Sequence, residues 1–234
     1  MGCGTSGLYH KLLTGRKEDF SGLRTFGGMS GFPKHKESPC DAFDTGHSST
    51  SISAALGYAR ARDLKGEDRT VVAVIGDGSL TGGMAYEALN NVSHLKSNMI
   101  IVLNDNNMLP FRKMLAVCRG YLNNLRADEG YNLLKKNGGG TLSRIPMIGS
   151  DLVGTLLRTK NSIKQLLIPG MWFENMGITY LGPVDGHDIK GLIRIFSEAK
   201  KINRAVLIHV ITKKGKGYRP AEKNPSAFHG VEPL

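Results

Sequence analysis

Residues 71–108 carry the stretch that decides the fold, VVAVIGDGSLTGGMAYEALNNVSHLKSNMIIVLNDNNM. An apolar, β-branched run ends in Gly-Asp-Gly, an amphipathic segment follows, and a second apolar run ends in Asn-Asp-Asn. This pattern predicts a strand, a turn, a helix and a second strand, which together form one βαβ unit of a parallel sheet. Because such sheets bind ligands at the carboxyl ends of their strands, we expect Asp77 and residues 104–106 at the ligand-binding edge.

The residue types in these two turns suit a divalent cation that holds a diphosphate. Carboxylate and carboxamide oxygens are hard ligands of the kind that Mg²⁺ prefers, and Mg²⁺ leaves other positions for phosphate oxygens and water. Gly76 and Gly78 are expected to permit close backbone approach and dihedral angles that a side chain forbids. A helix beginning near Leu80 would direct its first backbone amides at the phosphates. The alternative is an ordinary tight turn, but a second polar turn 29 residues after Asp77 favours the metal site.

Composition and charge narrow the class of protein. The 234 residues, 40% hydrophobic and 22% charged, suit one large α/β domain or two small ones, and no apolar run reaches the length of a membrane span. Three widely spaced cysteines indicate neither a metal cluster nor a disulfide framework, so we expect a reducing cytoplasm. The net charge of +11 lies entirely in residues 110–234, which carry 20 basic and 9 acidic residues. Because these charges are scattered among few aromatic residues, they favour phosphorylated small molecules or an acidic partner domain over nucleic acid.

Several segments resemble the 1-deoxy-D-xylulose-5-phosphate synthase family of transketolase-like thiamine diphosphate enzymes. In chain order they are GGMSGFPKHKES (27–38), FDTGHSSTSISAALG (43–57), VIGDGSLTGGMAYEALNN (74–91), LNDNNM (103–108), GPVDGHD (182–188) and TKKGKGYRPAE (212–222). The resemblance extends from about Tyr9 to Val231. It implies an α/β fold of the thiamine diphosphate-binding type, with a mostly parallel sheet flanked by helices. It also implies thiamine diphosphate and Mg²⁺ as cofactors.

The resemblance places the family's functional residues on matching positions of this chain. The Mg²⁺ ligands would be Asp77, Asn106 and the carbonyl group of Met108, with Asn104 as a rival for the amide ligand. His229 takes the place of a family histidine near the reacting carbons. The residues expected to contact the cofactor are Gly46, His47, Ser48, Gly78, Ser79, Asn106 and Tyr218.

Other candidate residues have structural alternatives. His187 is a candidate catalytic residue because Asp185 and Asp188 flank it and favour its protonated form. Asp188 suits equally well the N-cap of a helix over residues 189–201. The segment 46–50 also fits the start of a capped helix over residues 51–64, with His47 at the surface. KKGKGY (213–218) follows an apolar strand over residues 205–211, and it suits either a phosphate or a solvated basic turn.

By resemblance, the complete family enzyme condenses pyruvate with glyceraldehyde 3-phosphate to form 1-deoxy-D-xylulose 5-phosphate and CO₂, for isoprenoid and thiamine biosynthesis. The cofactor carries this chemistry, and the protein supplies binding and proton transfer. Such enzymes are usually homodimers, in which a Glu of a pyrimidine-binding domain activates the cofactor. We expect this chain to be an N-terminally incomplete diphosphate-binding domain without the pyrimidine-binding and C-terminal domains, and to have little synthase activity alone.

Parts of the chain leave room for other interpretations. Residues 109–168 are expected to be an irregular or helical connection, and the segment after Met108 departs from the family's usual sequence. Glu232 stands where the family usually has Gly. Two rival functions are a non-catalytic nucleotide- or phosphate-binding α/β module and a transketolase-type half subunit that needs a partner chain.

Overall fold

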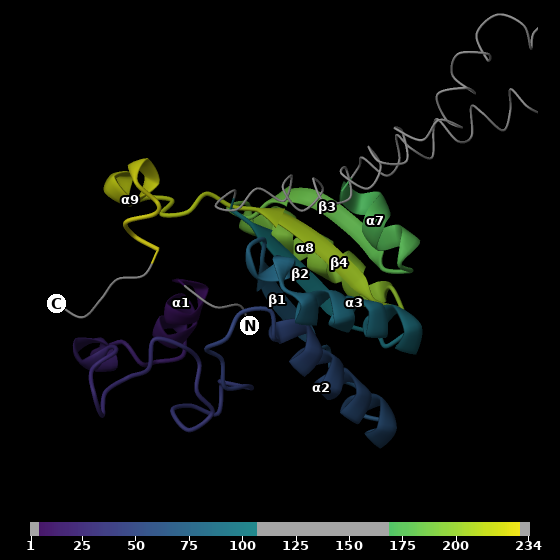
Figure 1. The fold of residues 1–234 in the computed structure, drawn as a ribbon, viewed down its shortest axis with the longest axis horizontal. Helices are drawn as coiled ribbons and strands as arrows, with labels where there is room; N and C mark the ends of the chain where they lie inside the picture. The colour runs from purple at the N-terminus through teal and green to yellow at the C-terminus, as the bar shows by residue number, and fades with distance from the viewer. Residues whose placement is uncertain (1–4, 107–168, 230–234) are drawn as a thin grey trace, which may run out of the picture. The chain divides into compact units, whose positions relative to one another are not determined.

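The computed structural model describes residues 5–106 and 169–229. The chain divides into two units, residues 1–110 with 173–234, and residues 111–172. The sheet belongs to the first unit (Figure 1). Met108 and the predicted connection over residues 109–168 lie outside the described residues. The described part resumes with the helix α7 (Pro169–Asn175).

Among the described residues, four parallel strands form one sheet in the order β1-β2-β4-β3. Their bounds are Val72–Gly76 for β1, Ile100–Asp105 for β2, Thr179–Asp185 for β3 and Val206–Ile211 for β4. β1 pairs with β2 in parallel, as the sequence predicts. β3 has a register shift against β4 between Leu181 and Val184. All four strands therefore end at one edge, where the polar turns begin.

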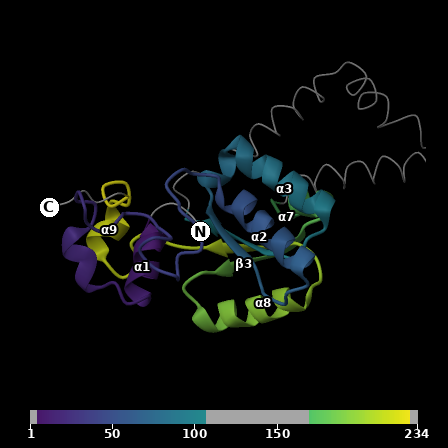
Figure 2. The ribbon, with the colours of Figure 1, turned by 90° about the horizontal axis from the view of Figure 1, so that it is seen from below.

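Helices cover both faces of this sheet, which is why its strands are so apolar (Figure 2). Successive strand residues point to opposite faces of the sheet, and different helices pack on each face. α2 (Ser51–Lys65) and α3 (Gly83–Leu95) pack on one face, and α8 (Ile189–Lys201) packs on the other. Beneath α8 lies a core cluster of six buried residues: Ile100, Val102, Ala199, Val206, Ile208 and Val210. None of the helices in the described ranges combines the length and hydrophobicity that crossing a bilayer requires.

The helix starts differ in part from those predicted. α2 begins at Ser51 as expected, but the hydroxyl of its N-cap residue Thr50 donates to the His47 carbonyl and makes no capping bond. A short 3₁₀ helix, η2 (Ser79–Thr81), occupies the predicted helix start, so α3 begins only at Gly83. The prediction of a helix from Leu80 is therefore wrong by three residues. α8 follows Asp188 as predicted, although the Asp188 side chain makes no capping hydrogen bond.

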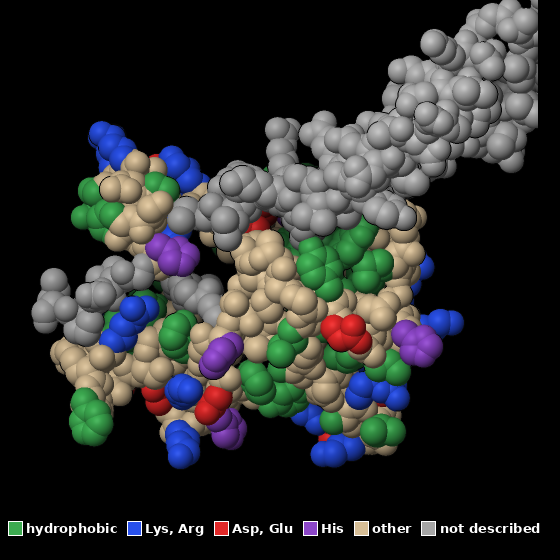
Figure 3. Space-filling view, viewed as in Figure 1, with side chains coloured by type: hydrophobic (Ala, Val, Ile, Leu, Met, Phe, Trp, Pro, Cys, Tyr) green, Lys and Arg blue, Asp and Glu red, His purple; other side chains and the backbone are tan. Residues whose placement is uncertain are grey.

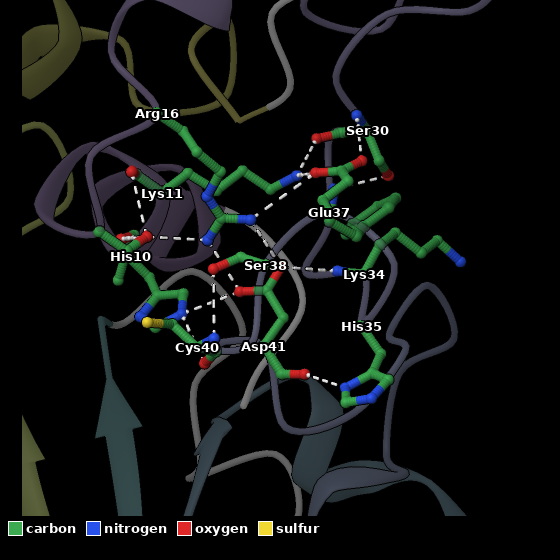
Figure 4. A network of polar contacts seen from close by, with 12 residues as sticks. His10, Lys11, Arg16, Ser30, Lys34, His35, Glu37, Ser38, Cys40 and Asp41 are labelled. Carbon is green, nitrogen blue, oxygen red and sulfur yellow. Dashed lines mark hydrogen bonds and ion pairs between the residues drawn. The ribbon is translucent and has the colours of Figure 1, made fainter.

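Residues 11–44 contain little regular structure beyond the 3₁₀ helix η1 (Glu18–Gly22), and ion pairs hold them together (Figure 4). Two nitrogens of the Arg16 guanidinium donate to the two carboxylate oxygens of Asp41, at 2.7 and 2.8 Å. The Asp41 carboxylate also accepts from the backbone N–H of Lys34 at 2.8 Å and contacts His10 Nε2 at 3.0 Å. Burial by itself raises the pKa of Asp41, but the hydrogen bonds from Arg16, Lys34 and His10 lower that pKa to about 2.

A second ion pair lies beside the first. The ammonium group of Lys11, on α1 (Thr5–Leu13), is fully buried; it pairs with Glu37 and donates to the Ser30 carbonyl at 2.7 Å. The hydroxyl of Tyr58 on α2 donates to the Ala42 carbonyl. These contacts fix the chain where it approaches residues 46–48, the segment expected to contact the cofactor.

We predict that Asp41→Asn lowers the free energy of unfolding at neutral pH by about 2 kcal/mol, because the variant loses an ionised partner of Arg16. The lowered pKa means that this stabilisation is present above the unfolded-state pKa near 4 and is lost as the pH falls through about 2. Urea unfolding between neutral pH and about pH 2 measures the difference between the two proteins.

The matched control is Asp19→Asn, which removes an exposed carboxylate from the same part of the chain. Its unfolding free energy should stay close to that of the unchanged protein at every pH. A stability difference for Asp41→Asn that stays constant down to about pH 2 would contradict the assigned pKa.

Candidate functional site

The turns after β1, β2 and β4 meet at the carboxyl edge and are joined by hydrogen bonds. The backbone N–H of Asp77 donates to the Asn104 carbonyl at 3.2 Å, and the Thr212 N–H donates to the Asp105 carbonyl at 2.8 Å. The Thr212 hydroxyl also donates to the side-chain oxygen of Asn104 at 2.7 Å. The two polar turns of the central βαβ unit therefore lie together, as the sequence predicts.

The structure separates the two candidates for the amide ligand. The side-chain oxygen of Asn104 is engaged by Thr212 within the protein. Asn106 instead lines a cavity at the same edge. This difference favours Asn106 over Asn104 as the ligand. Thr212 was not singled out from the sequence; its place directly after the apolar run 205–211 was the available signal.

The cavity has a volume of about 580 Å³, in the range of small-molecule binding sites. Three successive strand ends contribute its walls, together with the short helix α9 (Arg219–Lys223) and the residues after it. The residues that line it are Asn106, Pro183, Val184, Asp185, His187, Ile211, Thr212, Lys213, Lys214, Glu222 and Pro225. Two candidates from the sequence, Asn106 and His187, thus face one space.

Charged side chains gather beside this cavity. Asp77 is buried, with 5% of its surface exposed. Burial lowers the pKa of Lys214, and the negative charge of Asp77 offsets part of that lowering. The ammonium nitrogen of Lys214 contacts Nδ1 of the exposed His229. Lys214 therefore interacts with both a predicted metal ligand and a predicted catalytic histidine, although the sequence indicated it only as part of KKGKGY.

His187 joins two turns in this structure. Its Nε2 accepts a hydrogen bond from the Lys213 backbone N–H at 2.9 Å, which assigns the ring proton to Nδ1. Its own backbone N–H donates to the Asp185 carboxylate at 2.8 Å. A catalytic base at Nε2 would first have to release the Lys213 bond. The structure thus gives His187 a connecting role, and its catalytic role stays a prediction.

The loop of residues 213–218 is closed onto α9 by one carboxylate. Glu222 accepts from the Gly217 N–H at 2.8 Å and pairs with the Lys213 ammonium group, and these contacts lower the pKa of Glu222. Tyr218, predicted to contact the cofactor, is 58% exposed, and its ring meets Phe228 edge-on with centroids 5.8 Å apart. The loop therefore presents Tyr218 at the surface beside a fixed backbone.

Ser49 connects two segments that were expected to bind the cofactor. Gly46, His47 and Ser48 are exposed and directly precede Ser49. Ser49 has φ of 69°, a conformation that non-glycine residues seldom adopt outside functional or tightly held sites. Its hydroxyl donates to the Ser79 carbonyl at 2.7 Å, so the segment before α2 is fixed to the turn after β1.

The glycine that this connection requires is Gly82. A Cβ atom on Gly82 would lie 2.2 Å from the Ser49 hydroxyl oxygen. The expectation of special dihedral angles at Gly76 and Gly78 was wrong, whereas their close approach to a ligand stays a prediction. Gly78 has an ordinary φ of −63°, and a Cβ on Gly76 would meet nothing within 4 Å.

The donors at this edge fit Mg²⁺. The Asp77 carboxylate and the Asn106 amide both supply hard oxygen ligands, and Mg²⁺ keeps positions for phosphate and water. In the described ranges, no group of three His, Cys, Asp or Glu side chains forms a metal-binding cluster. Met108, the third predicted ligand, lies outside those ranges.

Comparison with known proteins first establishes the class of fold. Transketolase from Leishmania mexicana superposes with a TM-score of 0.54 at 19% identity, covering 88% of this chain and 26% of that one. A family model described as 1-deoxy-D-xylulose-5-phosphate synthase matches residues 3–212. The chain therefore belongs to the 1-deoxy-D-xylulose-5-phosphate synthase family, as its motifs indicated.

Relatives with that name resemble the chain over nearly all of its length. Those from Clostridium kluyveri and Lachnoclostridium phytofermentans are 60% and 57% identical over 231 residues. Each alignment covers 99% of this chain and 37% of the relative. The chain thus spans little more than a third of the length of these relatives.

We predict that Gly82→Ala destabilises the protein by about 1–3 kcal/mol, because the new methyl group displaces Ser49 from its bond to Ser79. The neighbouring Gly83→Ala is the matched control, since a Cβ there meets nothing within 4 Å. Gly83→Ala should be neutral or slightly stabilising at the start of α3. Urea unfolding of both variants measures the difference, and equal stabilities would show that the approach of Ser49 to Gly82 imposes no constraint.

Proposed function

We propose that this chain forms the diphosphate- and Mg²⁺-binding part of a thiamine diphosphate site. Through that site it would take part in the condensation of pyruvate with glyceraldehyde 3-phosphate to 1-deoxy-D-xylulose 5-phosphate and CO₂. The observation that carries the proposal is the meeting of the Asp77 turn with the Asn106 turn beside a cavity, in a chain of this family.

In this proposal, different residues of the chain bind the cation and the diphosphate. Asp77, Asn106 and the carbonyl group of Met108 hold Mg²⁺, while the backbone of Gly78 and Ser79 contacts the diphosphate. The basic loop of residues 213–218 would add positive charge beside the phosphates. Glu222 holds this loop in place. Further cofactor contacts come from Gly46, His47, Ser48 and Tyr218.

Proton transfer is assigned to His229. When bound, thiamine diphosphate supplies the carbon nucleophile and the electron sink of the reaction. An ammonium group can only donate, so the contact with Lys214 engages Nδ1 of His229 as an acceptor and leaves its proton on Nε2. His229 Nε2 would donate its proton to a substrate oxygen while Nδ1 takes a proton from Lys214, so that the ring stays neutral. His187 is the second candidate, with its Nε2 released from Lys213 during turnover.

The charge distribution supports small phosphorylated substrates, and a cytoplasmic location belongs to the same proposal. On the face shown in Figure 3, Lys and Arg side chains of the described part are spread over the surface and do not form one continuous stripe. Nucleic-acid binding proteins commonly gather their basic residues on one face. Lys213 and Lys214 instead line the cavity, where they would attract phosphate groups. A homodimeric assembly of the complete enzyme belongs to the same proposal.

Calorimetric titration of thiamine diphosphate into the pure chain tests the proposed site. Binding should require Mg²⁺ and be lost or weakened at least about 100-fold in Asp77→Asn, because the amide removes the ligand charge while keeping the shape. Glu87→Gln, which changes an exposed acid on α3, is the matched control and should bind normally.

Two further ligands separate the rival functions. ATP and NAD should bind more weakly than thiamine diphosphate and should not compete with it. Tight binding of either nucleotide, without Mg²⁺-dependent binding of thiamine diphosphate, would establish the nucleotide-binding module instead. Thiamine without its phosphates should also bind poorly, because the proposed contacts are made with the diphosphate.

A further inference from the structure

Two buried polar side chains and a half-buried tyrosine form a chain of hydrogen bonds across the sheet. The Tyr180 hydroxyl on β3 lies 2.7 Å from Nδ1 of His209 on β4. Nε2 of His209 lies 3.2 Å from a carboxylate oxygen of Asp105, the last residue of β2. His209 and Asp105 are only 6% and 8% exposed. Tyr180 and His209 were not candidates from the sequence, Asp105 was included only as part of the turn 104–106, and the proposed function uses none of the three.

The hydrogen bonds in this chain have one consistent direction. A carboxylate accepts only, so Nε2 of His209 donates to Asp105, and the Nδ1 of a neutral ring then accepts from the Tyr180 hydroxyl. Burial, together with the charge of Asp105, raises the pKa of Tyr180 to about 12, so that hydroxyl keeps its proton at neutral pH. The Phe173 ring stacks on Tyr180, with centroids 6.2 Å apart and planes at 10°. The donor at the start of the chain is thereby held in place.

The chain ends at the turn that carries Asn106. The carboxylate of Asp105 meets His209, and its carbonyl oxygen accepts from the Thr212 N–H at 2.8 Å. Both the side chain and the backbone of Asp105 are thus held by β4 and the residue after it. Apolar side chains of similar size would often stabilise a fold as well as a buried polar network does. Hydrogen bonds, however, depend on angle, so they fix the rotation of a turn as well as its position.

We propose that Tyr180 and His209 are positioning residues, which hold Asp105 and thereby orient the amide of Asn106 toward the bound cation. This inference rests on the proposed function, because that function assigns the cation to Asn106. Residues that hydrogen-bond a metal ligand typically change the metal affinity about 10–100-fold when they are replaced. The same range is expected for this chain of residues.

Mg²⁺ titration of the full chain in the presence of thiamine diphosphate, followed by calorimetry, tests the proposal. His209→Leu should weaken apparent Mg²⁺ affinity about 10–100-fold, because the leucine cannot donate to Asp105. His209→Gln keeps an N–H donor at the same reach and should recover most of that loss. Tyr180→Phe, which removes only the hydroxyl, should weaken affinity less than His209→Leu does.

Leu207→Ala is the matched control for simple loss of stability. Leu207 is a fully buried neighbour on the same strand and the same face, and its truncation leaves a cavity without removing a polar contact. Its melting temperature should fall, while its Mg²⁺ affinity, measured where the protein is folded, stays within about twofold of the unchanged chain. Equal affinities for His209→Leu and the unchanged chain, or an equal loss in Leu207→Ala, would overturn the positioning role.

Nitrogen NMR of the histidine rings provides a readout that does not depend on cofactor binding. His209 should carry a proton on Nε2, and an Nε2 without a proton would overturn the hydrogen-bond chain itself. If the unchanged chain shows no Mg²⁺-dependent binding of thiamine diphosphate, the proposed function fails and the positioning role fails with it. If the unchanged chain binds and the His209 variants bind equally well, only the positioning role fails.

Discussion

The site depends above all on Asn104, near the end of β2, which joins the turns after β1 and β4 at the carboxyl edge of the sheet. Its backbone carbonyl accepts from the Asp77 N–H, and its side-chain oxygen accepts from the Thr212 hydroxyl. The turns after β1 and β4 are therefore both held by hydrogen bonds to the end of β2. Apolar burial holds the sheet together but has no direction, so it cannot set how these turns face one another. Hydrogen bonds at the strand ends are directional, so they determine how the turns face one another.

Directional polar contacts also hold residues 11–44, the segment before the sheet. Residues 11–44 have few helices and strands to satisfy their backbone groups, and buried charges perform part of that role. Asp41 accepts from Arg16 and from the Lys34 backbone, so removing either partner would leave a buried charge without compensation. Further along the chain, Ser49 is bonded to the Ser79 carbonyl after β1. Two regions far apart in sequence thus reach the candidate cofactor site in fixed positions.

Glycine and histidine show how a motif can be assigned correctly for an incorrect reason. The Gly-Asp-Gly turn does lie at the ligand-binding edge, yet Gly78 adopts an ordinary φ and Gly82 is the residue that must lack a side chain. His187 does line the cavity, yet its Nε2 is engaged by the backbone of Lys213. His209, which no motif marked, is instead the buried histidine behind the Asn106 turn.

The sequence by itself determined the βαβ unit, the parallel pairing of β1 with β2, the family, and the meeting of the Asp77 and Asn106 turns. Those features follow from hydrophobic periodicity and from turn residues close together in the chain, which are local properties. Only the tertiary structure showed that Asn104 bonds to Thr212 while Asn106 lines the cavity, revealed Thr212 and Lys214, and aligned Tyr180 with His209 and Asp105. Those residues lie as many as 108 positions apart in the chain, as for Asn104 and Thr212. Their contacts arise from the β1-β2-β4-β3 order of the sheet, and the periodicity of a single segment carries no information about that order.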